Sequence, residues 1–199
     1  MRLIPNYLFG VKPYEKIAVF TVAIFVTILF AGVYGIVHDQ ITYSISPEYF
    51  TKFKYEQFGL EPQWFGGDRQ TVAVIGFLAT WWTGIFIGLG LGFTALIFRD
   101  YKSMWKALGK AMFVTFSFAV ANGVFGFFYG RFGLTEMNPT WWFPENITDK
   151  HAFNTVGTIH NFSYLGGLIG LVAGIYYLIK RNRLDRADQI QAQDSTGAV

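Results

Sequence analysis

The sequence predicts an all-α fold, a four-helix transmembrane bundle. Four long stretches contain no Asp, Glu, Lys or Arg: residues 17–37, 71–98, 111–130 and 152–179. A helix needs about 20 apolar residues to cross the hydrocarbon core of a bilayer, and each stretch meets this length. The composition agrees, because 52% of the 199 residues are hydrophobic and only 15% are charged. We therefore expect one transmembrane domain over residues 1–199.

Positive charge predicts the orientation of these helices. Most of the 16 Lys and Arg residues precede the first stretch, join the second to the third, or follow the fourth. Since positive residues concentrate on the cytoplasmic side, both termini are expected inside. This orientation predicts two outer loops, residues 38–70 and 131–151, and a polar inner tail, residues 180–199. The first stretch is interpreted as an uncleaved helix, because its apolar run is longer than that of a signal peptide.

The composition also excludes several functions. The chain has no Cys, which excludes thiolate metal sites, iron–sulfur clusters and covalently attached haem. It has no phosphate-binding loop of the Walker type, so nucleotide hydrolysis is not expected. The pI of about 9.0 reflects the Lys and Arg residues expected on the cytoplasmic side of the membrane, so no nucleic-acid partner is expected. The expected surroundings are the lipid bilayer, other membrane subunits or a second copy of the chain.

The first outer loop contains two local patterns. Residues 41–45 alternate apolar and polar side chains, which predicts a short extended piece. Residues 46–48, Ser-Pro-Glu, then suit an N-cap, the first helical position and an acid in the first turn. Aromatic residues follow at near-helical spacing: Tyr49, Phe50, Phe53 and Phe58. We expect a short amphipathic helix that covers the helix ends as a lid.

Two rows of glycines predict where helices pack closely. Each row has three glycines at intervals of four residues, which places them on one helix face. The rows are Gly84, Gly88 and Gly92, and Gly166, Gly170 and Gly174. In lipid, small residues let two backbones approach each other. We expect packing within one chain; the alternative is the interface of a homodimer.

The candidate site consists of histidines at the outer side. His151 and His160 are nine residues apart, so a single helix would point them in opposite directions. His38 and His160 are the better pair, since both lie on small-residue faces at the same depth, with Asp39 beside His38. Three nearby residues are expected as additional ligands or hydrogen-bond partners: Gln40, Asn161 and Tyr164.

Four interpretations of this pair stay open. His38 and His160 can be interfacial side chains with no cofactor, each hydrogen-bonded to a carbonyl or carboxylate. With Asp39 they can bind a transition metal. They can be the axial ligands of a b-type haem. Finally, a His–Asp relay can serve a quinone or a lipid head group.

Three segments resemble a family of small bacterial four-helix integral membrane proteins with no assigned activity. They are residues 38–40 (His-Asp-Gln), 46–50 (Ser-Pro-Glu-Tyr-Phe) and 160–167 (His-Asn-Phe-Ser-Tyr-Leu-Gly-Gly). The resemblance implies a location in the bacterial inner membrane and no catalytic residue. We expect a non-enzymatic accessory or subunit protein. The alternative is a redox, metal-binding or haem-binding membrane protein that uses His38, Asp39 and His160.

Overall fold

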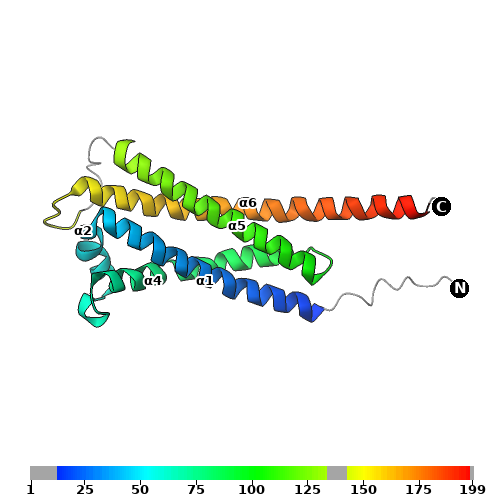
Figure 1. The fold of residues 1–199 in the computed structure, drawn as a ribbon, viewed down its shortest axis with the longest axis horizontal. Helices are drawn as coiled ribbons and strands as arrows, with labels where there is room; N and C mark the ends of the chain where they lie inside the picture. The colour runs from blue at the N-terminus through cyan, green and yellow to red at the C-terminus, as the bar shows by residue number, and fades with distance from the viewer. Residues whose placement is uncertain (1–12, 134–142, 198–199) are drawn as a thin grey trace.

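The computed structural model describes residues 13–133 and 143–197, and the regular structure of this part is entirely helical. Its four long helices lie side by side along the length of the molecule (Figure 1). They are α1 (Pro13–Ile45), α4 (Asp68–Ala95), α5 (Tyr101–Phe128) and α6 (Lys150–Gly197). All four are long and apolar enough to cross a membrane. The predicted fold class is confirmed, and the chain is a multi-pass membrane protein.

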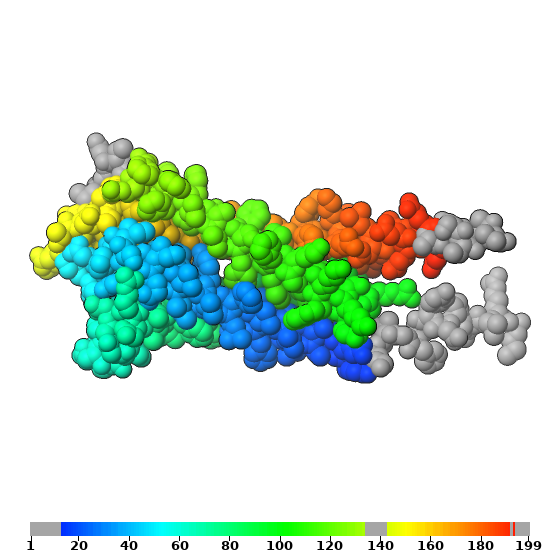
Figure 2. All heavy atoms as spheres, in the orientation of Figure 1, coloured from blue at the N-terminus to red at the C-terminus, as the bar shows by residue number. Residues whose placement is uncertain are grey.

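The two ends of the bundle differ. The start of α1 and the end of α6 share one end (Figure 1), as an even number of spans requires. The other end carries a segment that we call the cap, residues 46–67, and Figure 2 shows it against the start of α6. The cap contains α2 (Pro47–Tyr49), the π-helical turn η2 (Phe50–Lys54), α3 (Tyr55–Phe58) and the 3₁₀ turn η3 (Pro62–Trp64).

The predicted amphipathic helix is present in the cap, since residues 47–58 are continuously helical. The structure places another π-helical turn, η4 (Tyr129–Gly133), after α5. Three parts of the chain lie outside the described residues. They are residues 1–12 of the basic N-terminal segment, residues 134–142 of the expected loop 131–151, and residues 198–199 of the tail.

The glycine rows join the helices into two hairpins. On α4, Gly84 is packed so closely on Thr27 and Ile28 of α1 that a Cβ would overlap their backbone. On α6, Gly170 meets the backbone of Thr115 on α5 in the same way. The Thr27 hydroxyl donates to the carbonyl of Gly84 (2.8 Å), and the Thr115 hydroxyl to that of Gly170 (3.1 Å). All six glycines are buried within one chain, so a homodimer would have to use another face.

Two helices extend further than the sequence predicts. Residues 41–45 continue α1 rather than forming an extended piece. Burial decides this, because Thr42 continues the buried face of α1, and its hydroxyl donates to the carbonyl of His38 (3.1 Å). At the other end, α6 continues through the polar tail to Gly197, helped by an ion pair between Arg181 and Asp185 (2.7 Å).

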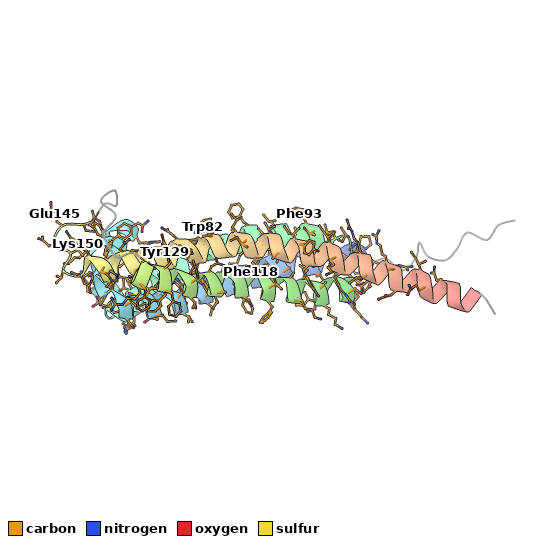
Figure 3. The ribbon with its side chains drawn as sticks, turned by 90° about the horizontal axis from the view of Figure 1, so that it is seen from above. Trp82, Phe93, Phe118, Tyr129, Glu145 and Lys150 are labelled. Carbon is orange, nitrogen blue, oxygen red and sulfur yellow. The ribbon has the colours of Figure 1, made fainter. Side chains whose placement is uncertain are left out.

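The interior contains two apolar clusters with a cavity between them. One apolar cluster near the chain ends contains Leu91, Met104 and Leu178, and a second joins the cap to α4 and α6 through Phe50, Ile75 and Val156. Between these clusters lies a cavity of about 320 Å³. Outside, the bundle exposes aromatic side chains, as suits a lipid-facing surface: Trp82, Phe93 and Phe118 (Figure 3).

Candidate metal centre

His38, Asp39 and His160 meet in the interior, between α1 and α6. The Nδ1 of His38 and the Nε2 of His160 lie 3.0 Å and 3.1 Å from the same oxygen, Oδ1 of Asp39. The two imidazole rings are nearly perpendicular, with centroids 4.6 Å apart. Asp39 is 2% exposed and His160 is 6% exposed, so the group is shielded from solvent. The structure thus brings together the three residues that the sequence analysis named, with the carboxylate of Asp39 between the two imidazoles.

The continuation of α1 brings Asp39 into the bundle. Three residues of α1 form one buried face toward the cap: Gly35, Asp39 and Thr42. They are spaced by four and three residues, which is the repeat of a helix face. Gly35 is packed directly against the backbone of Gly76 on α4, where no side chain would fit. This close contact holds α1 at the position from which Asp39 reaches α6.

The hydrogen bonds of His38 are those of a neutral imidazole. Its Nδ1 lies 3.0 Å from Asp39, and its Nε2 lies 3.2 Å from the hydroxyl of Ser163. In one tautomer Nδ1 donates to Asp39 and Nε2 accepts from Ser163, so each ring nitrogen has one partner of the right kind. In the other tautomer Nε2 donates to Ser163, and the lone pair of Nδ1 is available to a metal ion. His38 needs no additional proton.

His160 has a different arrangement. Its Nδ1 lies 2.9 Å from the carbonyl of Val156, and since a carbonyl only accepts, this nitrogen must carry a proton. In the neutral ring the Nε2 then has a lone pair, which points at the Oδ1 of Asp39. Two acceptors at 3.1 Å repel each other. Either a second proton on His160 or a cation between the two groups removes this conflict.

The second oxygen of Asp39 indicates a cation. Its Oδ2 is buried and has no hydrogen-bond partner among the described residues. Leaving such an atom unpaired costs about 1–3 kcal/mol, or more when it is charged. A proton on His160 would satisfy Oδ1 alone, whereas a metal ion can also engage Oδ2. One ligand atom from each of the three residues lies within 4.8 Å of the others, which a single ion can bridge.

The cap covers the outer side of this group. The ring of Tyr49 stacks on His160 with centroids 5.1 Å apart and an angle of 27° between the planes. The π-helical turn η2 brings Lys54 inward, where its Nζ donates to Gln57 (2.9 Å) and lies 5.4 Å from the ring centroid of Phe53. Lys54 and His160 line the same outer hollow, about 410 Å³ in volume. Sequence patterns did not indicate Lys54, because π-helical turns have no simple spacing.

The expected additional partners are only partly at this site. Gln40 faces α4 instead, where its amide donates to the backbone carbonyl of Arg69 (2.8 Å). Asn161 lines the outer hollow beside His160. Tyr164 lines both the hollow and the interior cavity, and its hydroxyl donates to the carbonyl of Ala79 (3.0 Å). The closest partners that the sequence did not assign are Ser163 and the carbonyl of Val156.

His151 lies apart from this group. Its Nδ1 is 3.2 Å from a guanidinium nitrogen of Arg131, near the start of α6. The half-turn offset between His151 and His160 thus separates them, as helical geometry requires. His151 is a natural control for experiments on the other two histidines.

Comparison of the chain with protein-family models, curated proteins and solved structures finds no match.

Proposed function

We propose that this membrane protein binds a divalent transition metal through His38, Asp39 and His160. The observation that carries the proposal is the pair of unsatisfied acceptors at the site. The Nε2 of His160 faces a carboxylate oxygen while its Nδ1 donates to a carbonyl, and the Oδ2 of Asp39 has no partner among the described residues. Metal-bound histidines commonly donate their other nitrogen to a backbone carbonyl in this way.

The ligand set favours zinc or iron(II). Two imidazoles and a carboxylate are typical ligands of both ions, and the chain has no thiolate to favour copper(I). Three protein ligands leave at least one coordination position for water or a substrate, which is the arrangement of a reactive site rather than a closed structural one. A b-type haem does not fit, because His38 and His160 contact each other with ring centroids only 4.6 Å apart.

The accessory or subunit interpretation has one observation in its favour. The contact between Asp39 and His160 joins the α1–α4 hairpin to the α5–α6 hairpin, a task that a purely structural ion pair can also perform. In that case His160 carries a second proton. This alternative predicts a metal-free protein that copurifies with other membrane chains.

Elemental analysis of the protein in mild detergent distinguishes these functions. We expect about one zinc or iron per chain, and loss of this metal in Asp39→Asn, which keeps the shape of the side chain. His151→Ala, which removes a histidine outside the site, should keep the metal. A metal-free wild-type protein that also fails to bind added Zn²⁺ or Fe²⁺ would overturn the proposal, and a stoichiometric partner chain would then support the accessory function.

We further propose a location in the bacterial inner membrane with both termini in the cytosol. The excess of Lys and Arg at the end where α1 begins and α6 ends supports this orientation. It places the cap and the metal site near the outer surface. Reporter fusions that are active only in the cytosol should be active at both termini, and inactivity at either one would reverse the assignment.

A further inference from the structure

The interior cavity has a polar end and an apolar end. The group at His38, Asp39 and His160 forms the polar end, together with Ser163. From there the walls become apolar, through Ile87, Phe116 and Leu171. The lining of α6 extends from His160 to Leu171, which corresponds to about 16 Å along the helix. The shape matches a molecule with one polar head and an apolar chain.

The cavity opens toward lipid rather than toward water. Its rim between α4 and α6 includes side chains that are exposed on the flank of the bundle: Trp82, Phe86 and Leu168. Trp82 is visible on this flank in Figure 3. On the outer side, Tyr164 and His160 separate the cavity from the outer hollow, since both line the two spaces. A molecule dissolved in the bilayer would thus reach the site from the side.

Charge restricts the kind of head group. Among the described residues that line the cavity, none is Lys or Arg, and Asp39 is the one carboxylate. In the metal-free site, an anionic head would have to lie beside this buried carboxylate in a medium of low dielectric constant, which is costly. With a divalent ion bound, Asp39 already neutralises one of its two charges, and no Lys or Arg lines the cavity to hold an anionic head. A neutral hydroxyl or carbonyl oxygen can instead accept from Ser163 or occupy the open position on the metal.

We propose that this cavity binds a membrane-dissolved amphiphile with a neutral oxygen-bearing head group, which enters between α4 and α6 and places its head at the His38–Asp39–His160 site. This inference deepens the proposed function and rests on it, because the same three residues hold the metal and form the polar end. The ligand would thus reach the site from the bilayer rather than from the outer solution.

Gly167 offers a way to fill the cavity without disturbing the helices. It lines the cavity, and a Cβ built on it meets no atom within 4 Å. Gly109 on α5 also has open space around its Cβ but does not line the cavity. Gly167→Phe and Gly109→Phe are therefore a matched pair, in which only the first occupies the space of the proposed ligand.

The experiment is photolabelling of the purified protein with dodecanol that carries a photoactivatable group in its chain. We expect labels in residues 79–87 and 163–171, and competition by unlabelled dodecanol. Gly167→Phe should reduce labelling about tenfold, while Gly109→Phe should leave it unchanged. Labelling that is spread over all lipid-facing surfaces, or that is equal in the two variants, would overturn the inference.

Two further measurements separate the possible failures. The metal content of each variant is measured on the same samples, so loss of label with retained metal supports the cavity assignment specifically. Site-specific labelling of a protein that binds no metal would support the cavity and contradict the metal function. Photoactivatable dodecanoic acid tests the head group, and stronger labelling by the acid at pH 8 than by the alcohol would overturn the neutral assignment.

Discussion

The Nε2 of His160 lies 3.1 Å from the Oδ1 of Asp39, although 121 residues separate them in the chain. This contact joins the first transmembrane helix to the last. It also places an imidazole and a carboxylate where neither is exposed to solvent. The stability of the bundle and the chemistry of the site therefore depend on the same pair.

Removal of one member of this pair should be costly. In metal-free protein, His160→Ala leaves the buried Asp39 with His38 as its one remaining side-chain partner among the described residues. Removing one member of a buried pair costs up to about 3–5 kcal/mol. Unfolding in mixed detergent micelles measures the loss. The double variant Asp39→Asn/His160→Ala should lose less than the sum of the two single variants, because no buried charge remains unpaired. Additive losses would show that the two side chains act independently.

Glu48 should make the attachment of the cap depend on pH. Its carboxylate accepts from the backbone N–H groups of Thr148 and Asp149 and from Lys52. These hydrogen bonds, that of Asp149 above all, lower the pKa of Glu48 from 4.5 to about 2. The stabilisation is fully present above pH 4.5 and is lost as the pH falls toward 2.

Hydrogen exchange tests this expectation. At pH 6 the amides of Thr148 and Asp149 should exchange at least tenfold faster in Glu48→Gln than in the wild type, after correction for intrinsic rates. The difference should shrink as the pH approaches 2. Glu56→Gln, at an exposed position of the cap, is the control and should exchange like the wild type. Equal protection in Glu48→Gln at pH 6 would contradict the assigned contact.

Lys54 should make the stability of the protein depend on pH a second time, in the alkaline range. Burial lowers the pKa of its amine, although the nearby carboxylate of Asp39 raises it. The folded state therefore releases this proton more readily than the unfolded state, and stability rises with pH through the lowered pKa up to about 10.4.

Two substitutions isolate this effect. Lys54→Met keeps most of the apolar stem without a charge, and Lys54→Arg keeps a charge that is not lost in this range. Between pH 7 and 10, the wild type should gain stability relative to Lys54→Arg in micelle unfolding. Lys54→Met should be at least as stable as the wild type at pH 7. A wild type that parallels Lys54→Arg at every pH would show that Lys54 stays protonated.

Gly170 should tolerate no side chain. A Cβ there would overlap the backbone of Thr115, whereas one at Gly109 would meet open space. Gly170→Leu must separate α5 from α6, and overpacking of this kind costs about 1–3 kcal/mol. Gly109→Leu should be neutral or slightly stabilising, because leucine favours the helix more than glycine does. Similar stability of both variants would exclude close packing at Gly170.

The sequence predicted most of the bundle because a bilayer imposes a simple rule. Runs of about 20 residues without charge indicate helices whatever their partners are. The pairing of His38 with His160 also followed from helical geometry and equal depth. The extension of α1 was not predicted, because the alternation in residues 41–45 is a local pattern, whereas the burial of Thr42 depends on helices distant in sequence.

The surroundings of the site were less predictable for the same reason. Ser163 lies one turn after His160, and helical spacing places it on the same face, but its contact with His38 depends on how α1 packs on α6. Lys54 could not be assigned, because the π-helical turn η2 changes which residues of the cap face inward. Gln40 was placed at the site because it neighbours Asp39, but adjacent residues of a helix point in different directions.

The division of the three ligands between α1 and α6 has a consequence for biogenesis. His38 and Asp39 leave the ribosome early, whereas His160 follows only after three helices have been made. The site therefore cannot form until synthesis has passed His160 on α6. Under the proposed metal function, loading would be a late step, taken when the second hairpin has joined the first in the bilayer. A chain truncated before α6 would carry only two of the three proposed ligands.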